Sequence, residues 1–151
     1  MQSNLANTYQ ELGRVEEALR SRRDAYSGYL KLLGEEHENT LHAANNYAAS
    51  LLNLRRFEEA KSLLRKTLRV ARRVFGEDHD NTLRMRSIYA CTLHNDPGAT
   101  LDDLREAVTA LEEIEPTARR VFGGAHPLAA NIERTLKEAR AALRAREPSS
   151  V

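Results

Sequence analysis

The sequence predicts an all-α protein, an α-solenoid of antiparallel helix pairs, and two observations support this prediction. First, an eight-residue segment beginning at Gly34 returns 42 residues later at Gly76, and a shorter third copy begins at Gly123. A fixed period in this range is typical of stacked structural repeats. Second, residues 1–96 contain no proline, helix-forming residues dominate the chain, and no window alternates between apolar and polar residues as a strand would.

Length and charge narrow the class of protein further. The 151 residues suffice for one domain, and the 41% of hydrophobic residues can supply a core. With 23 basic and 22 acidic residues, the net charge of +1 gives no general attraction to nucleic acid or to an anionic membrane. No apolar run approaches the ~20 residues of a membrane span. Cys91 is the only cysteine, and the N-terminus lacks an apolar signal core, so we expect a cytoplasmic protein.

Apolar spacing and loop signals together predict about seven helices. These cover approximately residues 2–12, 15–33, 38–54, 57–75, 80–94, 100–121 and 127–146. We expect a single domain over residues 1–147 and a flexible tail at 148–151. The domain consists of three repeats and a capping helix, at about 1–33, 38–75, 80–122 and 127–146. Pro116 falls inside the sixth helix and is expected to kink that helix or to end it near Ile114.

The long loops between repeats share a glycine and a histidine. Each glycine can adopt the left-handed conformation that ends a helix; these residues are Gly34, Gly76 and Gly123. Each histidine comes just before the next helix; these residues are His37, His79 and His126. Zinc ligands normally occur in close pairs such as His-x₃-His, which this sequence lacks. We therefore expect the histidines to cover helix ends, and we expect neither a metal nor another cofactor.

These residues resemble the tetratricopeptide repeat. The 42-residue period, the Gly-x-x-His loops and the Asn-Asn-Tyr-Ala run at Asn45 resemble the variant found in kinesin light chains. The resemblance covers about residues 2–146. It implies helix pairs whose first helices line a concave face, and in this family that face holds extended peptide segments of partner proteins.

The resemblance also implies which residues line that face. Asn46 matches the family asparagine that bonds the backbone of a bound peptide, and Asn4 stands 42 residues earlier. The candidate groove residues are Asn4, Asn7, His42, Asn45, Asn46, Asn53, Arg84, Ser87, Ile88 and His94. Within this set, Arg84 and His42 would select acidic or polar residues of the ligand. The alternative is that the asparagines are solvated residues of the helix surface.

Other patterns have simpler explanations than catalysis. Cys91 and His94 lie one helical turn apart, but no third group is evident to orient them. Paired glutamates, such as Glu58-Glu59, lie beside arginines and are expected to form solvated ion pairs. We therefore predict no enzymatic activity. The arginine stripe around Arg69 could meet an acidic partner or nucleic acid, although the near-neutral net charge favours a solubilising surface.

The two ends of the predicted stack differ, and this leaves two functions open. The last helix is polar enough to close the stack. The first helix lacks a Gly-x-x-His loop before it and begins almost at Met1, which indicates a longer or truncated array. An uncapped first pair exposes apolar surface and favours self-association into a homo-oligomer. The leading hypothesis is a scaffold that binds partner peptides, and the alternative is a structural or self-associating subunit without a peptide ligand.

Overall fold

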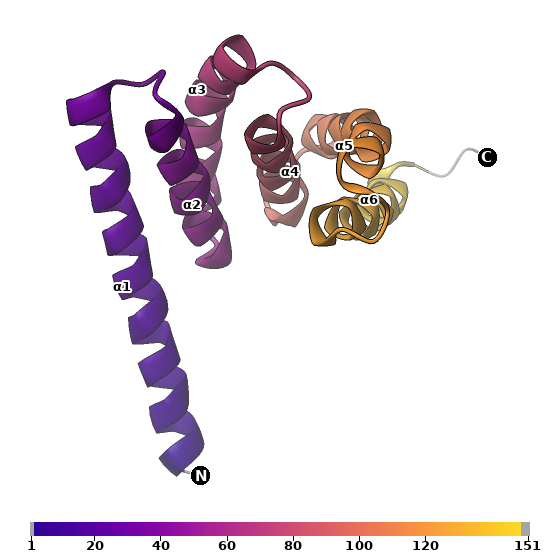
Figure 1. The fold of residues 1–151 in the computed structure, drawn as a ribbon. Helices are drawn as coiled ribbons and strands as arrows, with labels where there is room; N and C mark the ends of the chain where they lie inside the picture. Colours follow the sequence, from indigo (N-terminus) through magenta and orange to yellow (C-terminus); the bar gives the residue numbers. More distant parts are fainter. Residues whose placement is uncertain (1, 149–151) are drawn as a thin grey trace.

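The computed structural model describes residues 2–148, with the side chains of residue 8 and of residues 10–148. This part of the chain forms six α-helices and no strand. The helices are α1 (Gln2–Leu33), α2 (Glu38–Asn53), α3 (Phe57–Phe75), α4 (Asp80–Asn95), α5 (Leu101–Phe122) and α6 (Pro127–Arg146). Each helix packs on the next along the chain, α2 also packs on α4, and α4 packs on α6 (Figure 1). The predicted all-α repeat fold is confirmed.

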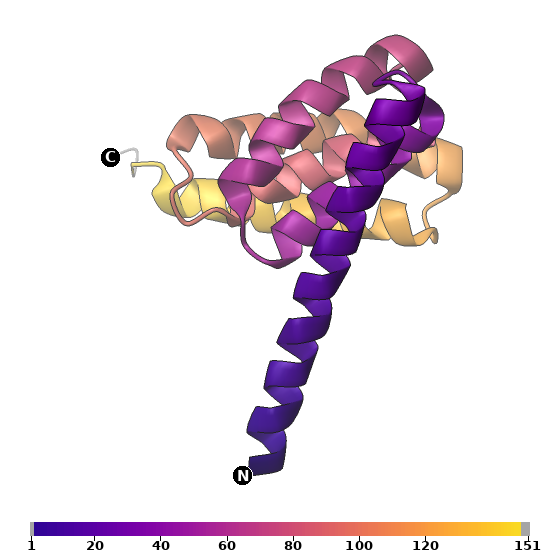
Figure 2. The same ribbon diagram turned by 90° about the vertical axis from the view of Figure 1, so that its left-hand side faces the viewer.

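The first repeat differs from the prediction. Residues 2–12 and 15–33 were expected to form two helices, but they form the single helix α1. Its N-terminal part projects away from the other five helices (Figures 1 and 2). One glycine inside a helix costs only about 1 kcal/mol relative to alanine, and Gly13 is followed by strong helix formers. Gly13 alone therefore does not end the helix.

Pro116 also has a smaller effect than expected. Helix α5 continues through Pro116 and ends at Phe122, not near Ile114. Pro116 is exposed, whereas Ile114 and Ala118 on either side of it are fully buried in the same apolar cluster. We infer that burial of these neighbours offsets the backbone hydrogen bond that proline removes.

The core runs through the whole stack. One cluster of buried residues joins α1, α2, α3 and α4, and a second joins α4, α5 and α6. Tyr89 of α4 packs against both clusters and so links them. Small residues recur at equivalent positions of α2 to α5 and are completely buried there; these are Ala48, Ala60, Ala90 and Ala107. Their short side chains leave little space between the helices, so larger residues there would overpack the core.

The histidines of the long loops cap helices. The Nδ1 atoms of His37, His79 and His126 accept hydrogen bonds from the backbone N–H two residues later, at 3.0, 3.1 and 3.1 Å. Two of the imidazoles stack on a preceding phenylalanine, Phe75 or Phe122, with ring centroids 4.4 and 4.6 Å apart. The glycine that begins each loop has a φ of 86–88°. The sequence prediction for these loops is confirmed.

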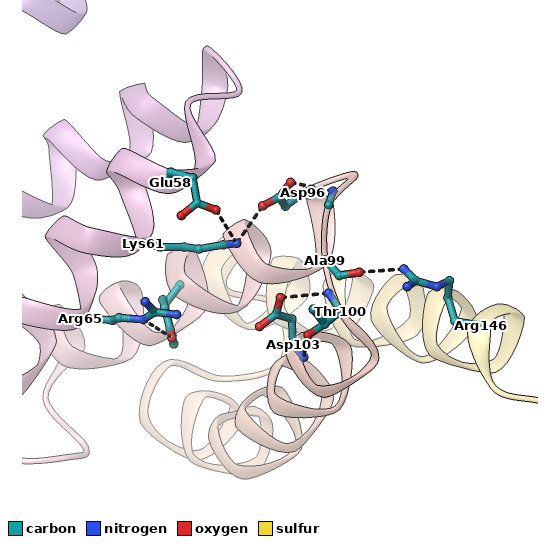
Figure 3. A network of polar contacts seen from close by, with 10 residues as sticks. Glu58, Lys61, Arg65, Asp96, Ala99, Thr100, Asp103 and Arg146 are labelled. Atoms are coloured by element: carbon teal, nitrogen blue, oxygen red, sulfur yellow. Dashed lines mark hydrogen bonds and ion pairs between the residues drawn. The ribbon is translucent and has the colours of Figure 1, made fainter.

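A buried ion pair fixes the loop between α4 and α5. Lys61 of α3 is only 6% exposed, and its Nζ lies 2.8 Å from Asp96 Oδ2 and 3.3 Å from Glu58 Oε1 (Figure 3). Asp96 also accepts a hydrogen bond from the backbone N–H of Gly98 at 2.9 Å. The hydrogen bond from Lys61 holds the pKa of the Asp96 carboxyl below its usual value. Asp96 therefore connects the end of α4 to the preceding helix pair.

The start of α5 and the end of α6 meet at the same loop. Thr100 Oγ1 accepts a hydrogen bond from the backbone N–H of Asp103 at 3.1 Å, and Asp103 accepts one from the backbone N–H of Thr100 at 3.0 Å. This reciprocal capping box makes Thr100 the N-cap of α5. Arg146 donates to the carbonyl oxygen of Ala99 at 2.8 Å (Figure 3). Gly123 follows Gly76 by 47 residues instead of 42, so this repeat has five extra residues. They lie in this loop, which the hydrogen bonds above hold in place.

Candidate functional site

A groove of about 470 Å³ lies along the first helices of the pairs, α2, α4 and α6. Its lining is His42, Asn45, Asn46, Ala49, Asp80, Asn81, Arg84, Ser87, Ile88, Leu128 and Asn131. We call these eleven residues the α2–α4–α6 groove. Six candidate residues from the sequence meet here, namely His42, Asn45, Asn46, Arg84, Ser87 and Ile88. They come together because α2 and α4 pack directly on each other.

The two adjacent asparagines of α2 have different surroundings. Asn45 is buried, and its Nδ2 donates to the backbone carbonyl of Asn81 at 3.2 Å, which ties α2 to α4. Its Oδ1 is also buried and has no hydrogen-bond partner among the described residues. Asn46 is exposed, and no described residue hydrogen-bonds its side-chain amide. Asn45 therefore positions the helices, whereas Asn46 is free to contact a ligand.

Charged and apolar side chains lie around these amides. Arg84 is exposed, with its Nε 4.0 Å from Asp80 Oδ2, and His42 is exposed one helical turn before Asn46. Ile88 and Leu128 give the groove a small apolar area. The groove can therefore offer hydrogen-bond donors and acceptors to a peptide unit, a cation to a carboxylate, and an apolar surface to a side chain.

A second cavity, of about 250 Å³, adjoins the groove at α1. It is lined by Arg22, Ala25, Tyr29, Asn39, His42, Ala43 and Asn46. Arg22 reaches across to α2, where its Nη1 donates to Ser50 Oγ at 2.6 Å. Because His42 and Asn46 line both cavities, they lie where the groove continues toward α1.

Two of the other candidate residues, Asn53 and His94, lie elsewhere. Asn53 is exposed at the end of α2, and it does not line the groove. His94 points toward α6 with only 9% of its side chain exposed, and its Nε2 lies 3.7 Å from Glu138 Oε2. Asn4 and Asn7 fall among the residues whose side chains the structure does not describe.

The lining also includes Ala49 of α2 and four residues that sequence reasoning missed, namely Asp80, Asn81, Leu128 and Asn131. Leu128 and Asn131 stand 47 residues after Asn81 and Arg84, which is the spacing of the third glycine loop. Asn81 itself matches Asn39 at the 42-residue period. Extending the register from the candidate Arg84 to the last helix would have identified Asn131; Leu128 and Asn81 share a register position with Asn39, which was not a candidate, and Asp80 lies beside Asn81.

We expect the stability of the protein to depend on pH, because the side chain of His94 is only 9% exposed. Burial lowers the pKa of His94, against the smaller opposing effect of Glu138. Since the folded protein then binds the proton less readily than the unfolded chain, the free energy of unfolding should fall as the pH drops below about 6.5. Urea denaturation at pH 7.5, 6.5 and 5.5 should show this slope. It should be reduced in His94→Gln and retained in His42→Gln, the exposed control; an equal slope in all three proteins would refute the assignment.

Cys91 does not have the surroundings of a reactive thiol. Burial raises its pKa, and its Sγ lies 3.7 Å from Thr135 Oγ1. A thiol is nucleophilic as the thiolate, so a raised pKa works against reactivity.

In the part of the chain that the structure describes, no three histidine, cysteine or acidic residues form a group that could hold a metal ion.

The surface arginines of α3 are largely paired. Arg72 lies 3.1 Å from Glu77, Arg73 lies 2.7 Å from Glu36, and Arg65 donates to the hydroxyl of Tyr89 at 3.3 Å. Exposed pairs of this kind contribute little stability, but the carboxylates offset the charges of Arg72 and Arg73. No helix in residues 2–148 combines the length and apolarity that crossing a membrane requires.

Comparison with known proteins agrees with the helical-repeat fold. A family model described as tetratricopeptide repeat matches residues 1–39 and 40–81, which together are more than half of the chain. Two crystal structures of a Podosopora anserina protein described as a kinesin light chain with nearly identical TPR-like repeats align over 93% of this chain. The sequence identity is 23% in both cases, with TM-scores of 0.76 for a form that carries a point substitution and 0.75 for the other.

A third solved structure, BtubC (BKLC) from P. vanneervenii, aligns over 97% of this chain with 18% identity and a TM-score of 0.54. The chain spans 64% of the length of the Podosopora anserina structures and 65% of BtubC. No curated protein matches the chain. The similarity to these structures concerns the fold.

Proposed function

Because the chain belongs to the tetratricopeptide repeat family, whose repeats generally mediate protein–protein interactions, we propose that it is a non-enzymatic scaffold that binds partner peptides. The α2–α4–α6 groove is the proposed binding site, and the ligand is an extended segment of another protein. The observation that supports this most strongly is the side-chain amide of Asn46, which is exposed and unpaired where two cavities meet.

An extended peptide needs hydrogen bonds for its backbone, and Asn46 can supply them. Its amide has one acceptor and two donors, so it can bond to both the C=O and the N–H of a peptide unit. Such contacts hold a chain whatever its side chains are. Asn45 supports this role indirectly, because its bond to Asn81 fixes α2 against α4.

Charge selects which peptide fits. Arg84 and His42 lie on the same groove, so an acidic side chain of the ligand can approach both of them. Asp80, 4.0 Å from Arg84, weakens this preference but does not cancel it. Ile88 and Leu128 favour an apolar residue next to the acidic one. We therefore propose that the partner segment combines acidic and apolar residues. We also propose that this protein acts in the cytoplasm, as expected from the sequence.

Substitution of Asn46 tests the proposal. Peptides are selected from a random displayed library and their dissociation constants measured by fluorescence anisotropy. Asn46→Ala should weaken binding about five- to tenfold, the loss of about one hydrogen bond. Asn53→Ala is the matched control, because Asn53 is an exposed asparagine of the same helix outside the groove. Equal affinities of the wild type and Asn46→Ala, or equal losses in both variants, would argue against the groove.

A second candidate function is a structural subunit that self-associates. The observation in its favour is the set of exposed apolar side chains on α1, namely Leu12, Val15, Tyr29, Leu32 and Leu33. Sedimentation velocity over a hundredfold range of concentration separates the two functions. A monomer that binds selected peptides supports the scaffold, and a constitutive oligomer without peptide affinity supports the structural subunit.

A further inference from the structure

One side of α1 is uncovered, although the same side of α3 and α5 is buried. We call this side the α1 stripe, and it consists of Val15, Ala18, Arg22, Ala25 and Tyr29, which are spaced three and four apart. Val15 is 37% exposed and Tyr29 is 40% exposed. The matching residues of α3 are Phe57, Ala60, Leu64, Thr67 and Ala71, and none of them is more than 8% exposed. Those of α5 are Leu104, Ala107, Leu111, Ile114 and Ala118, which are equally buried.

In the complete pairs, the preceding helix of the chain covers this stripe. Ala60, Leu64 and Ala71 of α3 share one buried cluster with residues of α2, and the α5 residues share a cluster with residues of α4. The residues that precede the α1 stripe are 2–12, and they have the apolar pattern of a covering helix. Leu5, Ala6, Tyr9 and Leu12 stand 42 residues before Tyr47, Ala48, Leu51 and Leu54. The family model likewise matches residues 1–39 as one repeat, just as it matches residues 40–81 as another.

The residue between these two parts of α1 suits a turn. The turn from α2 to α3 contains Arg55 with a φ of 59°, the one described non-glycine residue with positive φ. Gly13 stands 42 residues before Arg55. Glycine adopts positive φ without the steric cost that other residues have, and it weakens the interior of a helix. Gly13 therefore stands at the position where a hairpin needs the left-handed conformation. As a glycine, it also stabilises the straight helix less than another residue would.

We propose that Gly13 is a hinge, and that residues 2–12 fold back onto the α1 stripe to form a closed helix pair. The straight α1 is then the open form. In the closed form, the covering segment occupies the cavity lined by Arg22, Ala25 and Tyr29, which α1 leaves open beside α2. Because His42 and Asn46 also line that cavity, the hinge controls access to one end of the α2–α4–α6 groove. The hinge does not depend on whether the groove binds peptides.

The distance between the two halves of α1 distinguishes the forms. Spin labels are attached to Ser3→Cys and Lys31→Cys in a Cys91→Ala background, and their separation is measured by double electron–electron resonance. In the straight helix, the labelled positions are 28 residues apart in sequence, which places their Cα atoms about 42 Å apart. In a hairpin with the register of α2 and α3, the separation is about 15 Å. We expect both distances in the wild-type protein.

Two glycines of α1 provide the variant and its matched control. Gly13→Ala should reduce the ratio of closed to open form on the order of tenfold, because alanine favours the helix and disfavours positive φ. Gly28→Ala should leave the ratio within about twofold, since Gly28 lies in the half of α1 that stays helical in both forms, where it too leaves room for a Cβ. A long distance alone in the wild type would overturn the hinge, as would equal effects of the two variants. A short distance between mixed, singly labelled chains would instead assign the stripe to a second copy.

Discussion

Replacing Leu64 with alanine is expected to lower the free energy of unfolding by about 2–5 kcal/mol. Leu64 is completely buried in α3, within the cluster that includes Leu19 of α1, Leu41 of α2 and Met85 of α4. A cavity at this position removes apolar contacts from several helices at once. In a stacked repeat each unit is stabilised mainly by its neighbours, so the loss should affect the whole stack.

Urea denaturation followed by far-ultraviolet circular dichroism measures this loss. Leu32→Ala is the control, because Leu32 is 84% exposed on α1 and its truncation should change stability by no more than about 0.5 kcal/mol. If Leu64→Ala cost no more than Leu32→Ala, then the apolar cluster shared by α1 to α4 would not be what holds the stack together.

Removing the carboxylate of Asp96 should be the second largest effect, about 3 kcal/mol. Asp96→Ala leaves the ammonium of Lys61 buried, and among the described residues its remaining ion-pair partner is Glu58, whose side chain is 86% exposed. A buried charge without its partner is destabilising because the desolvation of the charge is no longer offset. We place the loss at the lower end of the usual range because Glu58 remains.

Two further measurements separate this pair from a general packing defect. In the double variant Lys61→Met, Asp96→Ala, the buried ammonium is removed together with its partner, and most of the lost stability should return. The lowered pKa of Asp96 means that its contribution is present above the pKa of the unfolded carboxyl, near 4, and is lost as the pH falls through the folded value. The acid limb of stability should therefore be flatter in Asp96→Ala. A double variant as unstable as Asp96→Ala would contradict the ion-pair explanation.

The sequence predicted α2 to α6 well because their boundaries have local signals. A glycine with positive φ ends α1, α3 and α5, and a histidine caps the helix that follows each of them, as at Gly76 and His79. The first pair was predicted less well. Gly13 has no capping residue or proline beside it, so the choice between a straight helix and a hairpin depends on tertiary contacts that a local pattern does not show.

The candidate groove was predicted in part for a similar reason. His42, Asn46, Arg84 and Ile88 come together because the repeat register places them on the same face of α2 and α4. The sequence does not show how far each helix rotates in the stack, and His94 turns toward α6 instead. Two of the missed residues, Leu128 and Asn131, follow the register only once the five extra residues around Pro97 are allowed for.

Hydrogen exchange of the backbone amides, with and without a selected peptide, locates the binding face in one measurement. A peptide in the α2–α4–α6 groove should slow exchange in residues 42–49 of α2 and 84–88 of α4, because contacts there stabilise these helices against local opening. Exchange in α3 and α5 should change much less. Slower exchange confined to α3 and α5 would show that the peptide binds the opposite face, and the groove would then have no role in recognition.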